Sequence, residues 1–235
     1  MLFFKKKNII ALDIGSSSVK LVALKKFKRG YYLTNLGIMP LPPETIVERS
    51  IMNSTAIVDA ILELVSKCKI KTKHIATSIS GNAVNIKKIT LPVMNYEQLQ
   101  DSIQWEVEQL IPYDISEVNM DVDILRSDEK EEGQMEVVLV AVKSEIINEY
   151  IETISEAGLL PIIMDVDCFA IQNMFEYNYG KKENETIVLA NIGASITNIN
   201  IIDKGISIFT RDISVGGNLY TNEIQKQLNI SFEEA

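Results

Sequence analysis

The stretch Asp13-Ile-Gly-Ser-Ser-Ser-Val-Lys20 near the start of the chain returns in altered form as Asn191-Ile-Gly-Ala-Ser-Ile-Thr-Asn198. In both copies an apolar run ends in Asp or Asn, turns through Ile-Gly and leads into a second β-prone run. Glycine permits a tight turn and a close backbone approach, and small hydroxyl residues add donors beside it. One such loop fits an ordinary β-hairpin. Two of them, opening two related parts of the chain, predict a pair of phosphate clamps that face one ligand.

The composition is that of a globular protein of one or two domains. The chain has 235 residues, of which 46% are hydrophobic and 23% charged, and its net charge is −9. A strongly acidic protein lacks the basic surface that binding of nucleic acid requires. A local anion site is still possible, because backbone N–H groups can hold phosphate without net positive charge.

The cysteines and the N-terminus favour a cytoplasmic protein. Cys68 and Cys168 are far apart and fit no metal motif, so we expect reduced thiols. Residues 1–7 place their lysines after the apolar residues, the reverse of a signal peptide, and we expect a solvated terminus. No apolar run approaches the roughly 18 residues that a membrane-spanning helix needs.

The first part of the chain predicts a βββαβ unit. β-branched and apolar runs predict strands over residues 8–13, 19–26 and 31–39, with turns at Gly15-Ser16 and Arg29-Gly30. Apolar residues at helical spacing predict a helix over 55–68, and a fourth strand follows over 74–80.

The next part predicts a compact β-α-β-β-α unit over residues 81–158, which we interpret as an insertion. Asn95 and Gln98 form a capping box that opens its first helix, and Pro112 ends that helix. Ser144 is expected to cap the second helix and Gly158 to close it. The expected elements are strands 83–91, 118–125 and 135–142, helices 95–111 and 145–157, and an acidic loop at 127–133.

After the insertion the opening pattern returns. A strand over 162–166 precedes a helix that Asp167 is expected to cap, and the polar residues 180–184 predict a hinge between two lobes. Three strands and a helix from Gly216-Gly217 then repeat the first lobe, with strands expected at 186–191, 196–203 and 206–213. The sequence stops soon after this helix, so we expect the second lobe to be incomplete, in a fragment or a short form.

Several segments together resemble one family in order along nearly the whole chain. They are residues 11–22, Leu91-Pro92, 105–112, 191–194, 209–213 and 216–221. The combination is similar to the PilM family of actin-like proteins of type IV pilus assembly, and more distantly to FtsA and to the cytoplasmic part of GspL. All belong to the actin, Hsp70 and sugar-kinase superfamily. The resemblance implies an α/β, ribonuclease H-like fold of βββαβ lobes. Residues 1–80 and 159–182 would form subdomain IA, 81–158 the inserted IC-type subdomain, and 183–235 the start of subdomain IIA.

The resemblance also implies ATP and Mg²⁺ as cofactors. Asp13 would hold the hydration shell of Mg²⁺, and Lys20 would neutralise phosphate charge. Asn191 stands where the family usually has Asp, so the second loop brings no charge to the metal. The cofactor-binding residues that the resemblance implies are Asp13, Gly15, Ser16, Ser17, Ser18, Lys20, Asn191, Gly193, Ala194, Thr197, Gly216 and Gly217. A purely structural turn is an equally good interpretation of Gly216-Gly217.

The residues leave open whether ATP is hydrolysed. Asp165 and Asp167 lie where superfamily members place a residue that orients the attacking water, but Asp167 also fits a helix N-cap. With Asn191 in place of Asp, we expect nucleotide binding rather than efficient hydrolysis. The Glu and Lys that contact the nucleoside in this family would follow residue 235, so a chain that ends there would bind ATP and Mg²⁺ less well. His74 and Trp105 are expected to be structural, with Trp105 in a core.

The function that the resemblance implies is an actin-like cytoplasmic scaffold of the type IV pilus inner-membrane platform. It would bind ATP between its lobes and the N-terminal cytoplasmic peptide of PilN in a groove near residues 81–91 and 95–112. It would contact other platform proteins, could self-associate, and would lie at the inner face of the membrane through its partners. Three alternatives remain: a GspL-like structural protein without nucleotide, a small-molecule phosphotransferase, and an FtsA-like division protein.

Overall fold

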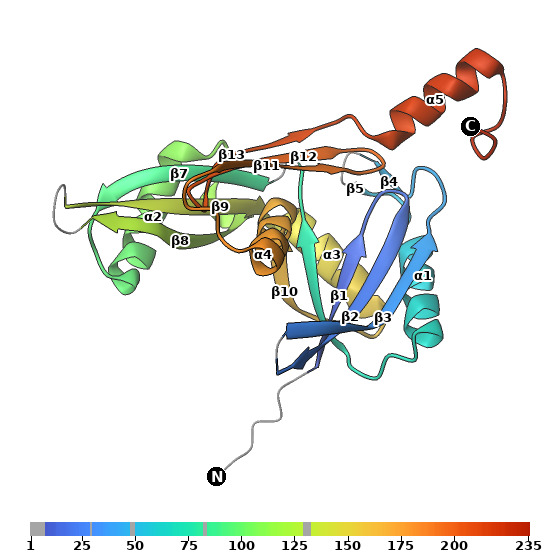
Figure 1. The fold of residues 1–235 in the computed structure, drawn as a ribbon, viewed down its shortest axis with the longest axis horizontal. Helices are drawn as coiled ribbons and strands as arrows, with labels where there is room; N and C mark the ends of the chain where they lie inside the picture. The colour runs from blue at the N-terminus through green and yellow to red at the C-terminus, as the bar shows by residue number, and fades with distance from the viewer. Residues whose placement is uncertain (1–7, 29, 48–49, 82–83, 129–132) are drawn as a thin grey trace, which may run out of the picture.

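The computed structural model describes residues 8–28, 30–47, 50–81, 84–128 and 133–235 (Figure 1). Within these ranges the side chains of residues 104–109 and 127–128 are not described. Five sequence expectations therefore lie wholly or partly outside the described residues: the solvated terminus at 1–7, the turn at Arg29-Gly30, the start of the strand at 83–91, the acidic loop at 127–133, and the core position of Trp105.

A five-stranded sheet in the order β10-β6-β1-β2-β3 forms the first lobe. β1 runs antiparallel to β2 and parallel to β6, and β6 runs parallel to β10. This confirms the predicted βββαβ unit. The strands are β1 (Ile9–Ile14), β2 (Ser18–Phe27), β3 (Gly30–Pro40), β6 (His74–Ile79) and β10 (Leu160–Val166).

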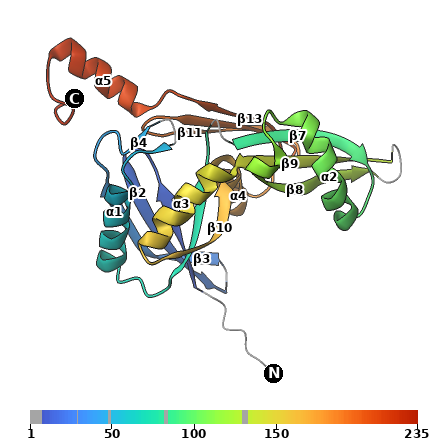
Figure 2. The ribbon, with the colours of Figure 1, turned by 180° about the vertical axis from the view of Figure 1, so that it is seen from behind.

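Helices α1 (Ser54–Lys67) and α3 (Ser144–Glu156) cover one face of this sheet and contact each other (Figure 2). Ile10, Leu12 and Ile14 alternate along β1 and are buried in the same cluster as Ile57, Ile61 and Ile154 of the helices. Asn53 caps the N-terminus of α1, and its side chain accepts a hydrogen bond from the Ala56 amide. The apolar residues that recur every second position in the strand and about every 3.6 positions in the helices therefore pack in one core.

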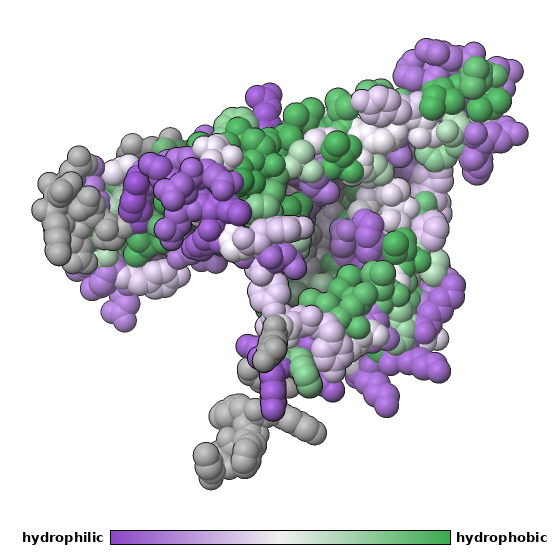
Figure 3. Space-filling model, viewed as in Figure 1, coloured by the Kyte–Doolittle hydropathy of each residue, from purple (hydrophilic) through white to green (hydrophobic). Residues whose placement is uncertain are grey.

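The opposite face of the sheet carries exposed apolar side chains toward β3 (Figure 3). Leu36 and Ile38 are each 58% exposed. They pair in register with Val22 and Lys20, so they share the face of the sheet from which Lys20 extends.

The insertion has its own sheet, in the order β7-β9-β8, and its own core. Leu99 and Ile103 of α2 pack with Met135, Val137 and Leu139 of β9. The predicted capping box is confirmed: the Asn95 amide donates to Gln98 at 3.0 Å, and the Gln98 amide donates to Asn95 at 2.9 Å. The elements are β7 (Val84–Pro92), α2 (Tyr96–Leu110), the 3₁₀ turn η1 (Ile115–Glu117), β8 (Val118–Asp128) and β9 (Gln134–Lys143).

The position of α3 differs from the sequence expectation. Tyr150 and Ile154 are buried in the core of the first lobe, not in that of the insertion. The reason is topological, because the parallel strands β6 and β10 need a crossover that returns the chain over one face of the sheet. Ser144 is also not the expected cap: no side chain caps α3, and the Ser144 hydroxyl accepts a bond from Asn119. Gly158 closes the helix as predicted, at φ +77°.

The second lobe is a three-stranded sheet in the order β11-β12-β13. Helix α4 packs against β12 on this side and against β10 and β6 on the other, so it joins the two lobes (Figure 1). Among the described residues, no helix is long and apolar enough to cross a bilayer. The elements are α4 (Asp167–Tyr179), β11 (Thr186–Ile192), β12 (Thr197–Asp203), β13 (Ile206–Ile213) and α5 (Gly217–Leu228).

Candidate functional site

The β1–β2 and β11–β12 loops form the same turn in the two lobes. Gly15 donates its backbone N–H to the Ser18 carbonyl at 3.1 Å, and Gly193 donates to the Ile196 carbonyl at 2.9 Å. A Cβ at Gly193 would lie only 2.9 Å from that carbonyl oxygen, so the turn requires glycine. The sequence repeat is therefore also a repeat of backbone structure.

Both turns leave backbone donors for a ligand. Among the residues that the structure describes, none accepts a hydrogen bond from the amides of Ser16, Ser17, Ala194 or Ser195. All of these residues line one cleft between the lobes. Backbone N–H groups that converge in a concave loop form a site for an anion.

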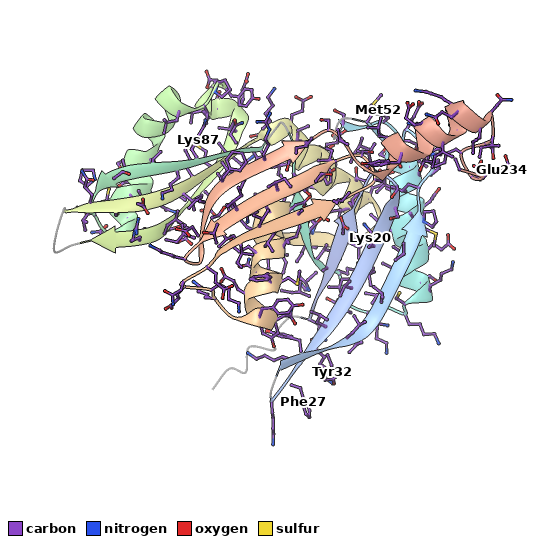
Figure 4. The ribbon with its side chains drawn as sticks, turned by 45° about the horizontal axis from the view of Figure 1, so that its top comes forward. Lys20, Phe27, Tyr32, Met52, Lys87 and Glu234 are labelled. Atoms are coloured by element: carbon purple, nitrogen blue, oxygen red, sulfur yellow. The ribbon has the colours of Figure 1, made fainter. Side chains whose placement is uncertain are left out.

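The strand residues beside the turns pair differently in the two lobes. Lys20 Nζ lies 2.8 Å from Asp13 Oδ2, and both side chains are exposed. Asn191 and Asn198 occupy the same register positions in the second lobe, and Asn191 Nδ2 donates to Asn198 Oδ1 at 3.0 Å. The first lobe thus brings an ion pair to the cleft, and the second brings a neutral pair of amides. Figure 4 labels Lys20 on β2.

The cleft has a volume of about 480 Å³, within the roughly 300–1,000 Å³ that is usual for small-molecule sites. Predicted residues that line it are Asp13, Gly15, Ser16, Ser17, Lys20, Asp167, Asn191, Gly193, Ala194 and Gly216. Lining residues that sequence reasoning missed are Ile14, Glu44, Ile46, Val47, Ser195, Ile196, Asn198, Ser214, Asn218, Leu219 and Asn222. Ser195, Ile196 and Asn198 belong to the repeated stretch and were open to prediction. Glu44, with Ile46 and Val47 of the short strand β4 (Ile46–Val47), carries no sequence signal for this position.

Ser18, Thr197, Gly217 and Asp165 do not line the cleft. Ser18 is buried, and its carbonyl accepts the Gly15 bond. The Thr197 hydroxyl donates to the Val215 carbonyl at 2.7 Å. The Gly217 amide donates to the Gly193 carbonyl at 2.9 Å, so this donor serves the loop and not a ligand.

Helix α5 is attached to the second loop at very short range. Besides the Gly217 bond, the Asn218 amide donates to the Ala194 carbonyl at 2.8 Å. A Cβ at Gly216 would lie 2.5 Å from the Ala194 oxygen and 2.6 Å from the Gly193 oxygen. The absence of a side chain at Gly216 therefore lets the helix start against the loop.

Asp167 lies in the cleft and is not the helix cap that the sequence predicted. The cap position of α4 is Val166, and no side chain caps the helix. The Asp167 carboxylate instead accepts hydrogen bonds from the hydroxyls of Ser78 at 2.6 Å and Ser80 at 2.5 Å. Asp165 accepts from the Val166 amide, and burial raises its pKa, with a further rise from the charge of Asp167.

A second hollow of about 300 Å³ lies where the insertion meets both lobes. We call it the insertion groove; it is lined by Ser80, Gly81, residues 84–87, Val166, Cys168 and residues 210–212. Among the described residues, the buried Nδ2 atom of Asn85 has no hydrogen-bond partner. Burial raises the pKa of the Cys168 thiol to about 12, which keeps it protonated and unreactive at neutral pH.

A family model described as type IV pilus assembly protein PilM matches residues 11–235. A solved PilM–PilN type IV pilus biogenesis complex aligns with a TM-score of 0.86 and 26% identity, over 97% of this chain and 67% of that one. Ethanolamine utilization protein EutJ from Carboxydothermus hydrogenoformans aligns at TM-score 0.55 and 13% identity, over 96% of this chain and 58% of its own.

The cytoplasmic domain of EpsL, an inner-membrane component of the type II secretion system of Vibrio cholerae, aligns at TM-score 0.52 and 10% identity, over 92% of this chain and 74% of its own. At these low identities the likeness to EutJ and EpsL is one of fold. Together with the sheet order, these likenesses confirm the predicted actin-like α/β fold.

The attachment of α5 predicts a contrast between adjacent glycines. Gly216→Ala is expected to lower the free energy of unfolding by about 1–3 kcal/mol, because the new methyl group clashes with backbone that cannot move aside cheaply. Gly217→Ala is the control: its added Cβ would lie 3.8 Å from the nearest atom, so a change within about 0.5 kcal/mol is expected. Urea titration of both variants measures this, and equal effects would contradict the close approach.

Proposed function

Because the chain belongs to the PilM family of type IV pilus assembly proteins, we propose that it is a cytoplasmic scaffold of the pilus platform. It binds ATP with Mg²⁺ in the cleft between its lobes and a PilN-like N-terminal peptide in the insertion groove. Partner proteins hold it at the inner face of the membrane. The observation that carries the nucleotide proposal is the pair of equivalent turns, whose unpartnered amides line one cleft.

The charges of the cleft fit a nucleotide that arrives with a divalent cation. Among the described residues that line the cleft, Asp13, Glu44 and Asp167 are acidic and Lys20 is the one cation. Polyphosphate alone would be repelled by this excess of carboxylates, and Mg²⁺ bound to the phosphates reverses the balance. The described residues contain no cluster of three or more metal-ligating side chains. Mg²⁺ in such sites usually keeps several waters and takes one or two carboxylates plus substrate phosphates.

The residues divide the work of holding that group. Lys20 would exchange its contact with Asp13 for a phosphate, and Asp13 would then be free to hold the hydrated metal. The Ser16, Ser17, Ala194 and Ser195 amides would donate to phosphate oxygens from the two sides. Asn191 would offer an amide oxygen where the family usually offers a carboxylate, so the second lobe would add no charge to the site. The bound metal would neutralise the phosphates, and this donor set supports binding more than hydrolysis.

The insertion groove supports the peptide part of the proposal. β7 is an edge strand of its sheet and β13 is an edge strand of another, and residues of both line the groove. Extended peptides bind edge strands through main-chain hydrogen bonds, and side-chain donors add selectivity. Asn85 supplies such a donor, because its buried amide has no partner among the described residues. Gly81 and residues 84–87, from the first of the two segments that the resemblance implied, line this hollow. The described residues of 95–112 do not line it, so their part in a peptide groove stays a prediction.

Loss of the cleft cation is expected to weaken nucleotide binding. Lys20→Gln should raise the Kd for Mg-ATP about tenfold to a hundredfold, because a charged hydrogen bond contributes roughly 1.5–3 kcal/mol. Lys25→Gln on the same strand is the control, since Lys25 does not line the cleft. Calorimetric titration measures both. A wild-type chain that does not bind Mg-ATP, or equal weakening by both variants, would reject the site.

Substitution of Asn85 is expected to change the affinity for the peptide without lowering the free energy of unfolding. Asn85→Ala should weaken binding of a synthetic PilN N-terminal peptide about fivefold or more, through loss of a buried donor. It should leave the free energy of unfolding unchanged or slightly higher, because the donor has no partner in the free protein. Asp59→Ala, at an exposed position of α1 that does not line the groove, is the control. Unchanged peptide affinity in Asn85→Ala would remove Asn85 from the site.

A further inference from the structure

Asn198 forms part of a hydrogen-bonded chain that leaves the nucleotide cleft. The residue is 4% exposed, and its side chain has partners on both sides. Asn198 Oδ1 accepts from Asn191 Nδ2 at 3.0 Å, and Asn198 Nδ2 donates to Asp212 Oδ1 at 2.6 Å. The other oxygen of Asp212 accepts a short hydrogen bond from the Gly81 amide.

The two ends of this chain lie in different hollows. Asn191 and Asn198 line the nucleotide cleft, whereas Asp212 and Gly81 line the insertion groove. Gly81 follows β6 of the first lobe and precedes β7 of the insertion, so its amide lies at the junction of the two. The bonds thus run from β11, through β12 and β13, to the base of the insertion.

We propose that Asn198 and Asp212 are positioning residues that couple the two sites, so that occupancy of the cleft changes the affinity of the groove. The inference rests on the proposed function, and it deepens that function by naming how the peptide site is regulated. An Asn191 amide whose oxygen is engaged in the cleft cannot turn over. Its N–H then stays on Asn198, which keeps Asp212 directed at Gly81 and holds the groove in the shape seen here.

The donor-to-acceptor direction of these hydrogen bonds explains why residue 191 is Asn. The Asp212 carboxylate only accepts, so Asn198 must direct its NH₂ group toward Asp212 and its oxygen toward residue 191. Residue 191 must therefore be a donor. An Asp at this position, as in the family pattern, would face the Asn198 oxygen or force a flip that sets that oxygen against Asp212. A mismatch of this kind in a buried network is costly.

The same donor and acceptor requirements predict a second substitution that restores the hydrogen bonds lost in Asn191→Asp. In the double variant Asn191→Asp/Asp212→Asn, every bond of the chain can reverse direction: residue 212 donates to Asn198, and Asn198 donates to residue 191. The oxygen of the new amide at 212 still accepts from Gly81. Asn191→Asp alone interrupts this row of hydrogen bonds, and adding Asp212→Asn restores it. A residue with a merely structural role would not produce this pattern.

The test measures the affinity of a synthetic PilN N-terminal peptide by calorimetry, with and without saturating Mg-ATP, in the wild type, Asn191→Asp and the double variant. The ratio of the two affinities cancels any change in peptide binding itself. We expect a ratio of about fivefold or more in the wild type, a ratio near one in Asn191→Asp, and recovery in the double variant. A wild-type ratio of one, an unaltered ratio in Asn191→Asp, or no recovery would overturn the coupling.

A second measurement separates this inference from the proposed function. Hydrogen exchange of the Gly81 amide in the ligand-free protein reports the Asp212 bond directly. Exchange should be about tenfold or more faster in Asn191→Asp and should return toward the wild-type rate in the double variant. If the wild type binds neither ligand, the proposed function fails, and the exchange rates still decide whether the chain of bonds exists. Unchanged exchange in Asn191→Asp would overturn it.

Discussion

The hydrogen bond from each turn glycine to the carbonyl three residues later is the interaction on which the cleft depends. Closing the turn at Gly15 and at Gly193 uses the glycine amide itself and leaves the next two amides available. In the second lobe the same closure presents the Gly193 and Ala194 carbonyls to the start of α5. One local geometry therefore shapes the floor of the cleft and fixes the helix beside it.

The contact between the lobes contains polar side chains beside apolar ones. Asn198, Asn200 and Ile202 alternate on the buried side of β12. Asn200 donates to the Cys168 carbonyl and to Gln172 of α4, each at 3.2 Å, and accepts from Ser207 at 2.7 Å. Polar interfaces of this kind allow domains to move relative to one another. The lobes are thus joined by satisfied hydrogen bonds that can exchange, and the Asn191–Asn198–Asp212 chain lies along the same seam.

Features fixed by nearby residues were predictable from the sequence. The repeated turn, the Asn95–Gln98 capping box and the αL position of Gly158 each depend on partners within a few residues, and all three are present. Features fixed by distant partners were not. The sequence gives no sign that Ser78 and Ser80 bind Asp167, because β6 is brought beside β10 only by the crossover.

The same limit explains the position of α3 and the role of Asn198. Helical periodicity shows that α3 has an apolar face but not which core that face enters, and the crossover between β6 and β10 decides this. Asn198 gains its importance from its register opposite Asn191 and Asp212 on two neighbouring strands. The repeated stretch indicated the pairing of Asn198 with Asn191, and nothing in the sequence indicated its pairing with Asp212.

We propose that one polyphosphate is held from both lobes at once. Hydrogen exchange of the Ser16, Ser17, Ala194 and Ser195 amides, measured with and without Mg-ATP, tests it most directly. Slower exchange in both loops on addition of Mg-ATP is the expected result, because all four amides would then donate to phosphate. Protection confined to one loop, or absent from both, would contradict a shared site.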